Sequence, residues 1–528
     1  MTTARTTAPD AVVIGAGPNG LVAANLLADA GWRVVVLEAQ PEPGGAVRSD
    51  SGLHPAYVHD LFSAFYPLAA ASPVIGQLHL EREGLRWSRA PAVVAHPLSD
   101  GRCAVLASDV HDTAASLERF APGDGAAWER LYGLWQRIGD DVLSCLFTPF
   151  PPVRAGLRLA ARLRYAEGLR VARTMLLPAR RLGEEEFAGD GARLLIAGNA
   201  LHADLGPESA LGGGFGWLMC MLGQAYGFPV PEGGARALSA ALVRRLTARG
   251  GSVRCGQAVA EVVVRGGRAV AARTEDGTEV PARRAVLADV PAPLLYGRLL
   301  APEHVPARLR SDLRRFQWDF STVKVDWALS RPIPWRAQGA ATAGTVHLAE
   351  GLDELTLFAA QIAMRRVPRT PFAVLGQMTT ADPSRSPSGT ESAWAYTHVP
   401  QEIVGDAGED GLTGRWDERE KEAIAARVEA QVERYAPGFR ATVRARRVLA
   451  PPDLERLNPA LVGGAVNQGT TNLHQQLVFR PVPGTGRPTT PVRGLYLASA
   501  TAHPGGGVHG APGANAARTV LRSLHRLH

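Results

Sequence analysis

The sequence is poor in cysteine and lysine, and its basic charge is carried almost entirely by arginine. The four cysteines, Cys103, Cys145, Cys220 and Cys255, lie far apart and form neither a C-x-x-C pair nor a metal-ligand spacing. A redox-active dithiol is therefore not expected, and we predict no metal site.

Long apolar runs are also missing. No stretch is apolar for long enough to span a bilayer, and the first nine residues form a short polar arm rather than a signal peptide. We therefore expect a cytoplasmic protein. The formal charge of +7 permits attraction to anionic surfaces, but no segment is typical of a nucleic-acid-binding module, so we predict no nucleic-acid partner. Nothing in the pattern indicates an oligomeric state.

The chain is long, and its composition is typical of a globular protein. The chain has 528 residues, of which 46% are hydrophobic and 20% charged. This length exceeds one ordinary hydrophobic core, so we expect at least two domains.

The most informative stretch runs from Asp10 to Ser49 and reads as strand, glycine turn, helix and strand. The apolar run Ala11 to Ile14 is typical of a strand in a parallel sheet. The G-x-G-x-x-G spacing follows at once and predicts a dinucleotide site, because it allows a tight turn, a close approach of backbone to a pyrophosphate, and packing of helix on strand. The residues that we assign to this turn are Gly15, Gly17, Pro18, Asn19 and Gly20.

The acidic residue Glu38 ends the second strand of this unit, and Ala39 follows it. A carboxylate at this point hydrogen-bonds the ribose hydroxyls of the adenosine, and its charge would repel a 2′-phosphate. We therefore assign both residues to the cofactor site and disfavour NADP.

A glycine pair and an arginine, Gly44, Gly45 and Arg48, come next. This pattern resembles the motif by which the flavin amine oxidase and phytoene desaturase superfamily brings a guanidinium to the FAD diphosphate. Arginine suits a phosphate because its donors form a planar fork. The resemblance implies FAD, bound non-covalently, with no separate nicotinamide domain.

The resemblance extends over nearly the whole chain. It covers phytoene desaturases, carotenoid ketolases and the pyridine nucleotide-disulphide oxidoreductase domain 2 proteins, and it implies that backbone groups of Val259 bind adenine. Near the carboxyl end, Gly506, Gly507 and Val508 would approach the flavin, and the dipole of a helix from about Pro512 would stabilise the reduced, anionic ring. Three residues depart from the family pattern around the flavin, namely Ser499, Thr501 and His509.

The expected fold is mixed α/β and α+β. A Rossmann-like FAD-binding domain of the glutathione reductase and amine oxidase type would comprise residues 1–84, 228–297 and 485–528. An interleaved substrate domain of mixed sheet and helices would comprise residues 85–227 and 298–484.

An arginine-rich segment at 150–182 interrupts the substrate domain. Leu159, Leu163, Leu169, Ala172 and Leu176 would fall on one face of a single amphipathic helix. Two interpretations stay open: a solvated helix that roofs the substrate cavity, and a basic helix that makes peripheral contact with a membrane.

The candidate catalytic residues are Lys324 and His503. Lys324 lies on an expected strand, Ser321 to Leu329, and resembles the strand lysine of amine oxidases, whereas His503 precedes the terminal glycine run. A buried lysine or a histidine can take up a proton. The alternatives are a surface lysine and a loop histidine bonded to backbone. Four further polar residues are weaker candidates near the flavin or the substrate: His54, His59, Asp60 and His202.

The predicted function is FAD-dependent dehydrogenation of a hydrophobic substrate, of polyene, polyketide or isoprenoid type. Hydride would pass to the flavin, and oxygen or a quinone would reoxidise it. A flavin amine oxidase or a carotenoid ketolase is the alternative among enzymes. A non-catalytic lipid-binding protein on the same fold is the alternative of another class.

Overall fold

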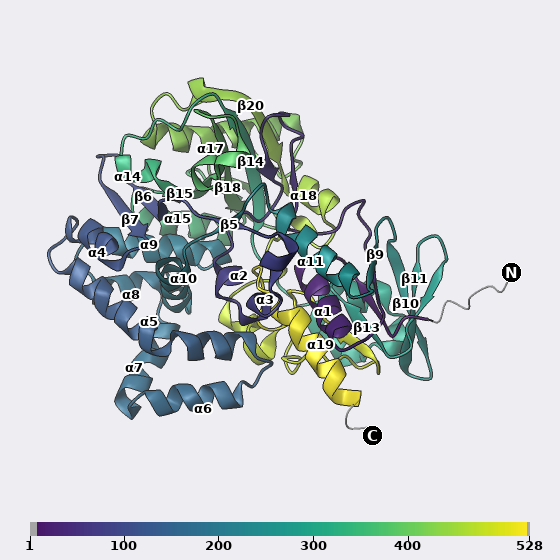
Figure 1. Cartoon of the computed structure of the whole chain (residues 1–528). Helices are drawn as coiled ribbons and strands as arrows, with labels where there is room; N and C mark the ends of the chain where they lie inside the picture. Colours follow the sequence, from purple (N-terminus) through teal and green to yellow (C-terminus); the bar gives the residue numbers. More distant parts are fainter. Residues whose placement is uncertain (1–7, 525–528) are drawn as a thin grey trace.

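The computed structural model describes residues 8–524, in which two large sheets lie side by side (Figure 1). Most of the polar arm expected at the amino terminus, residues 1–7, lies outside the described part. The search for membrane-spanning helices among the described residues found none that is both long and apolar enough.

The first sheet is parallel and five-stranded, in the order β21-β13-β1-β2-β9. Its central strand β1 is short and apolar because both faces are covered: Val13 packs in one core cluster and Val12 in another. The strands are β1 (Ala11–Ile14), β2 (Val34–Leu37), β9 (Ser252–Arg254), β13 (Ala285–Ala288) and β21 (Leu495–Leu497).

Three helices cover one face of this sheet, with α1 lying between α11 and α19 (Figure 1). They are α1 (Pro18–Asp29), α11 (Arg236–Ala248) and α19 (Ala511–Leu524). Gly31 follows α1 with a φ of 79°, the left-handed backbone that glycine adopts readily. The opposite face packs against a three-stranded antiparallel sheet of β10 (Val259–Arg265), β11 (Arg268–Thr274) and β12 (Glu279–Pro281).

The second large sheet is mixed and seven-stranded, in the order β20-β14-β18-β17-β15-β6-β7. All neighbouring strands are antiparallel except β15 and β6. The strands are β6 (Ala92–Pro97), β7 (Cys103–Ala107), β14 (Ser321–Leu329), β15 (Ala343–Leu348), β17 (Ala373–Gln377), β18 (Glu391–Val399) and β20 (Val443–Leu449). The bounds expected for β14 are confirmed.

Helix α17 (Glu418–Tyr435) covers one face of the seven-stranded sheet, where Val428 of the helix and Val325 of β14 belong to one core cluster. Asp417 caps the start of this helix, since its carboxylate accepts from the Glu420 backbone N–H at 2.9 Å. The Glu420 side chain, however, accepts from backbone N–H groups of the preceding loop, including that of Trp416, rather than closing a capping box.

The strands of the two sheets follow the predicted division of the chain. Every strand of the five-stranded and three-stranded sheets comes from residues 1–84, 228–297 or 485–528, and every strand of the seven-stranded sheet comes from the other segments. One pair crosses between them, β5 (Trp87–Ser88) with β8 (Val230–Pro231). The domain boundaries themselves stay a prediction.

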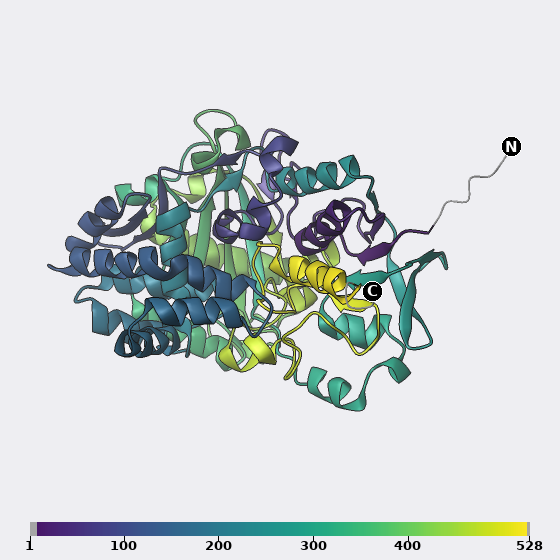
Figure 2. The same cartoon turned by 60° about the horizontal axis from the view of Figure 1, so that its bottom comes forward.

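The prediction of a single amphipathic helix across 150–182 is wrong. The segment folds as α6 (Val153–Arg162) and α7 (Tyr165–Leu176), because Leu163 and Arg164 take extended backbone angles between them. The break lets Leu159 and Leu163 pack against the core while other apolar side chains stay exposed. Both helices lie on the outside of the molecule, at the lower edge of Figure 1 and toward the viewer in Figure 2.

The remaining elements are short or helical. The helices are α2 (Pro67–Ala71), α3 (Pro73–Gly76), α4 (Val110–Glu118), α5 (Asp124–Phe147), α8 (Ala179–Glu186), α9 (Asp190–Ala200), α10 (Gly212–Tyr226), α12 (Ala292–Leu294), α13 (Ala307–Leu313), α14 (Gln338–Ala341), α15 (Leu352–Ala363), α16 (Met378–Ala381) and α18 (Pro451–Leu457). The two-residue strands are β3 (Ser49–Asp50), β4 (His59–Asp60), β16 (Arg366–Val367) and β19 (Gly405–Asp406).

Candidate functional site

A cavity of about 480 Å³ reaches from the glycine turn after β1 to the inner face of the seven-stranded sheet. Most of the residues predicted to bind the cofactor line it: Gly15, Gly17, Pro18, Asn19, Glu38, Ala39, Gly45, Val259, Gly506, Gly507 and Val508. Gly20, Gly44 and Arg48 do not line it, and they pack behind the wall. Segments far apart in the sequence therefore converge on one site.

The glycine turn is shaped by Asp289, which lies at the end of β13. A Cβ on Gly15 would lie 2.7 Å from the Asp289 carbonyl oxygen, and one on Gly17 would lie 2.6 Å from its carboxylate. The Gly20 N–H donates to that carboxylate at 2.8 Å. Burial raises the pKa of Asp289 to about 7. Sequence analysis did not identify Asp289 as part of the site.

Gly20 has the tightest surroundings of the three glycines. A Cβ there would lie 2.2 Å from the Gly15 carbonyl oxygen. Only glycine therefore lets α1 start so close to the end of β1, which is the packing function that the motif predicts.

Glu38 is buried at the end of β2 and lines the cavity. Its carboxylate accepts from the backbone N–H of Ala16 at 2.7 Å and from that of Gln40 at 2.8 Å. These bonds fix the carboxylate, which keeps acceptor capacity for further donors because two oxygens offer about four lone-pair positions.

Arg48 stabilises the loop that contains Gly45, and it does not line the cavity. Its guanidinium donates to the carbonyl of Gly45 at 3.1 Å and to that of Leu457, and it lies 5.4 Å from the centre of the Phe62 ring. Burial lowers its pKa. A direct contact of Arg48 with a diphosphate stays a prediction.

The terminal glycine run closes the cavity from the other side. A Cβ on Gly506 would lie 2.8 Å from the side-chain oxygen of Asn467, and Gly507 has a φ of 100°. The fully buried Arg480 holds this loop, since it donates to the carbonyls of Ala500 and Thr470, each at 2.9 Å. Sequence analysis missed Arg480.

At the cofactor end of the cavity, three lining residues have a buried polar atom without a partner among the described residues: Asn19 Oδ1, Asn467 Nδ2 and Gln468 Oε1. All three residues lie near the glycine turn or the terminal run. Unpaired buried polar atoms are costly, so a cavity with such atoms beside two glycine cradles fits a large polar cofactor such as a flavin dinucleotide.

The far wall of the cavity is one face of the seven-stranded sheet. Lys324 of β14 pairs in register with Tyr396 of β18, which pairs with Val374 of β17, and all three line the cavity. Trp394 also lines it and stacks on Tyr396, with ring centres 5.9 Å apart. This face is therefore aromatic and apolar around one cation.

Lys324 is buried, and its ammonium pairs with the Asp326 carboxylate, with Nζ 5.9 Å from the centre of the Trp394 ring. Asp326 also binds Arg447 at 2.8 Å, and Arg447 binds Asp50 at 2.8 Å. Burial lowers the pKa of Lys324, and the neighbouring carboxylate opposes that shift. The lysine is thus inside the cavity wall, as a catalytic residue would be, and not on the surface.

His503, unlike Lys324, does not line the cavity. Its Nε2 donates to the Thr148 carbonyl at 3.0 Å, and the residue is buried outside the set that lines the cavity. Burial lowers its pKa to about 4. The geometry matches a loop histidine bonded to backbone, and a catalytic function of His503 stays a prediction.

A histidine pair lies at the edge of the sheet face. His202 lines the cavity, and its Nε2 lies 2.7 Å from Nε2 of the buried His347. Burial lowers the pKa of His202 to about 4 and that of His347 well below its usual value, so both rings are neutral near pH 7. Sequence analysis named His202 and missed His347.

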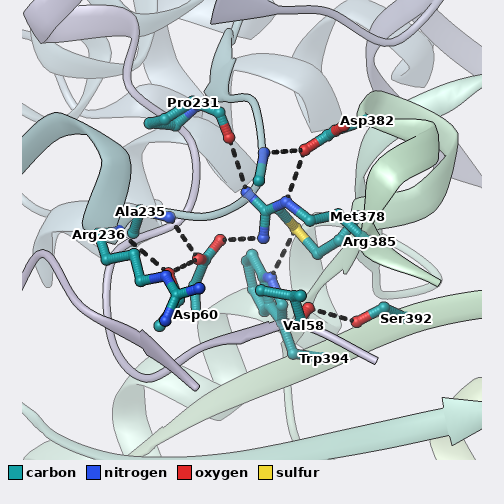
Figure 3. Close-up of polar contacts among 12 residues, drawn as sticks. Val58, Asp60, Pro231, Ala235, Arg236, Met378, Asp382, Arg385, Ser392 and Trp394 are labelled. Carbon is teal, nitrogen blue, oxygen red and sulfur yellow. Dashed lines mark hydrogen bonds and ion pairs between the residues drawn. The ribbon is translucent and has the colours of Figure 1, made fainter. Parts of the chain in front are cut away.

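The other polar candidates, His54, His59 and Asp60, do not line the cavity. His59 and Asp60 belong to the half of the molecule with the five-stranded sheet, the cofactor half, and contact the half with the seven-stranded sheet, the substrate half. His59 contacts the Trp327 carbonyl at 3.1 Å, and His54 packs edge-on against Tyr57. Asp60 pairs at 2.9 Å with the fully buried Arg385, which also binds Asp382 (Figure 3).

No group of three or more potential metal-ligating side chains lies together anywhere in residues 8–524.

Comparison with known proteins gives one consistent result. The sequence pattern of the family described as flavin containing amine oxidoreductase matches residues 19–521. The chain is 29% identical to the mouse pyridine nucleotide-disulfide oxidoreductase domain-containing protein 2, over 98% of this chain and 94% of the relative. It is 26% identical to a lycopene-forming phytoene desaturase of Pseudescherichia vulneris, over 97% and 98% of the two chains.

A similar fold occurs in a solved putrescine oxidase bound to putrescine. The TM-score is 0.61 at 18% identity, and the match covers 98% of this chain and 99% of that chain. At this identity the likeness concerns the fold, and it confirms the predicted arrangement of mixed α/β and α+β parts.

Proposed function

The chain belongs to the family of flavin-containing amine oxidoreductases and is an FAD-dependent oxidoreductase, and on that premise we propose that it dehydrogenates a hydrophobic substrate. When bound, FAD supplies an acceptor for the hydride that leaves a substrate C–H bond, and oxygen or a quinone takes the electrons afterwards.

The observation that carries the proposal is the distribution of charge around the cavity. Its acidic lining residues, Glu38, Glu275 and Asp289, all belong to the cofactor half. The wall toward the seven-stranded sheet has no carboxylate and is built from apolar, aromatic and neutral polar side chains around Lys324. These include Phe65, Phe215, Met219, Phe228, Val374 and Trp394.

This wall favours an apolar substrate over an alkylammonium ion. Burying a cation without a counter-charge is costly, and the one charge on the wall, Lys324, has the same sign as the amine. Large apolar surface in contact with aromatic side chains is, in contrast, favourable.

We further propose that Lys324 handles the proton that accompanies hydride loss. Formation of a double bond removes a hydride from one carbon and a proton from its neighbour. Only the neutral amine of Lys324 can accept that proton, and burial shifts the pKa of Lys324 in the direction that favours the neutral form. Nζ would then receive the proton, and Asp326 would stabilise the ammonium that results.

The test is anaerobic bleaching of the flavin by a panel of carotenoids, smaller isoprenoids, polyketides and alkylamines. We expect a polyene or isoprenoid to bleach the bound FAD and to gain a double bond. Bleaching by amines alone would make the protein an amine oxidase. Incorporation of oxygen into the product would make it a ketolase.

A further inference from the structure

The exposed helical hairpin of α6 and α7 carries a second surface that the cofactor and substrate sites do not use. Large hydrophobic side chains are exposed along it at helical spacing, so that each helix has an apolar stripe. They are Val153 (60% exposed), Leu157 (66%), Tyr165 (85%), Leu169 (55%) and Leu176 (52%).

The arginines of the segment fall into two groups. Arg158 and Arg162 bind the buried carboxylate of Asp141 on α5, and Arg173 binds Glu185 on α8. These arginines fasten the hairpin to the body of the protein. Each of these arginines therefore has a carboxylate partner, although Arg158 and Arg162 share one.

The second group has no such partners. Arg154, Arg164 and Arg170 are exposed, and their side chains form no hydrogen bond or ion pair with the residues described in 8–524. The one acidic residue of the two helices, Glu167, is paired with Arg137. The outer side of the hairpin is thus a line of apolar side chains flanked by uncompensated positive charge. We call these five hydrophobic residues and three arginines the hairpin surface.

We propose that the hairpin surface docks on the anionic face of a lipid bilayer. Helices of this kind lie in the plane of the membrane interface, with apolar side chains at the acyl boundary and arginines at the headgroups. The charge is complementary to anionic lipid, and no neighbouring element covers the helices in either view (Figures 1 and 2). None of these apolar residues lines the cavity, and they lie along two helices on the outside of the molecule, which favours a deformable lipid surface over a folded protein partner.

The hairpin is joined directly to the cavity wall. The Gly213 N–H donates to the Leu177 carbonyl at 2.8 Å, and a Cβ on Gly214 would lie 2.6 Å from the Met175 carbonyl oxygen. The end of α7 therefore packs on the start of α10, which contributes Phe215 and Met219 to the cavity. A bilayer under the hairpin surface would lie next to the wall of the substrate cavity. The docking itself does not depend on the proposed reaction.

The experiment is co-sedimentation of the FAD-loaded protein with vesicles of phosphatidylcholine, alone or mixed with phosphatidylglycerol. We expect binding to the mixed vesicles that weakens as salt is raised. The charge variant Arg154→Glu/Arg164→Glu/Arg170→Glu should lose at least about a hundredfold in affinity, since each basic residue near such a surface contributes about fivefold. The apolar variant Leu157→Glu/Leu169→Glu should lose binding as well.

Matched controls separate the hairpin from general effects of charge and exposure. Arg310, Arg415 and Arg444 are exposed and likewise form no hydrogen bond or ion pair with described residues, and Leu357 is 55% exposed on α15. Arg310→Glu/Arg415→Glu/Arg444→Glu changes the net charge equally, and Leu357→Glu replaces an exposed apolar side chain elsewhere by a charged one. The charge control should lose much less than the hairpin variant, and Leu357→Glu should bind like the parent.

Hydrogen exchange of the parent protein needs no variant and gives a second result. Residues 153–176 should exchange more slowly on phosphatidylglycerol vesicles than in solution. Absence of binding by the parent, equal binding by the hairpin variants, or no added protection would overturn the proposal. A change from dimer to monomer in the apolar variant, with no vesicle binding by the parent, would assign the surface to contact between copies of this chain.

Discussion

The cofactor half and the substrate half of this molecule differ in how their sites are built. In the cofactor half, Gly15, Gly17, Gly20 and Glu38 lie within one strand, helix and strand unit, and their function depends on spacing. In the substrate half, the cavity wall is a row of side chains from strands that are far apart in the sequence, such as Lys324, Val374 and Tyr396. The residues of the cofactor site are therefore close together in the sequence, whereas those of the cavity wall in the substrate half are brought together only by folding.

The interface between the two halves also differs from the interior of each half, because it contains a buried ionic link. The link shown in Figure 3 buries Arg385 between Asp60 of the cofactor half and Asp382 of the substrate half, with a third bond to the Pro231 carbonyl at 3.1 Å. Charged groups are buried there because they are paired and hydrogen-bonded. The contact between the two halves is therefore ionic as well as apolar.

The largest effect is expected from breaking that link. Arg385→Met leaves Asp60 and Asp382 buried without their counter-charge, and it should lower the free energy of unfolding by about 3 to 5 kcal/mol. Urea unfolding measures this. Arg298→Met, which removes an exposed pair with Glu275, is the matched control and should change stability by less than about 1 kcal/mol. Equal stability of both variants would mean that the halves are held by apolar contact alone.

A large kinetic effect is expected in the substrate half. Lys324→Met should retain FAD and slow flavin reduction by about 10² to 10⁴-fold, the range expected when an acid/base group is lost. His503→Ala, on a residue that does not line the cavity, should slow it much less. Stopped-flow reduction under anaerobic conditions compares the two. An unchanged rate in Lys324→Met would contradict proton transfer to Lys324, and the cavity wall would then contribute to the reaction only by positioning the substrate.

A smaller change in stability, with loss of cofactor, is expected in the cofactor half. Gly20→Ala forces a Cβ against the Gly15 carbonyl oxygen, and overpacking of this kind costs about 1 to 3 kcal/mol. The variant should purify with little FAD. Gly133→Ala, in the middle of α5 with no atom within 4 Å of the added Cβ, should keep its FAD and gain slightly in helix stability. Full FAD content in Gly20→Ala would show that the turn tolerates a shift.

The smallest effect concerns pH and has opposite signs in the two halves. The pKa of His96 in the substrate half is lowered by burial from 6.5 to about 4. Above pH 6.5 it contributes nothing to the pH dependence. Below that value the unfolded chain binds a proton that the native state refuses, so stability falls as pH falls toward 4. The pKa of Asp289 is raised to about 7, so its contribution is fully present below pH 3.8 and is lost as pH rises through 7.

Urea unfolding between pH 4 and pH 8 separates these contributions. His96→Gln should reduce the loss of stability that occurs as the pH falls from about 6.5 toward 4, whereas Asp289→Asn should reduce the loss that occurs as the pH rises from about 4 to about 7. His111→Gln changes an exposed histidine, with 81% of its side chain accessible, and should match the parent. Parallel pH profiles for all four proteins would contradict the assigned burial.

The contrast between features that are local in the sequence and features assembled by folding also explains how much could be predicted from the sequence. The glycine turn, Glu38, the terminal glycine run and the limits of β14 were predictable because each depends on residues close in the chain. Asp289 was not recognised because its bond to Gly20 spans 269 residues, and His347 was missed because its partner His202 is 145 residues away. The helix expected at 150–182 failed because tertiary packing of Leu159 and Leu163 outweighed a continuous helical pattern.

The central claim is that a hydride passes from a carbon of an apolar substrate to FAD inside this cavity. The direct measurement is anaerobic stopped-flow reduction of the bound flavin by an isoprenoid from the panel, compared with the same compound deuterated at the carbons that become the double bond. The account predicts flavin bleaching that is slower with the deuterated compound, with one double bond formed per flavin reduced. Flavin that stays oxidised with every apolar compound and is bleached by alkylamines would contradict it.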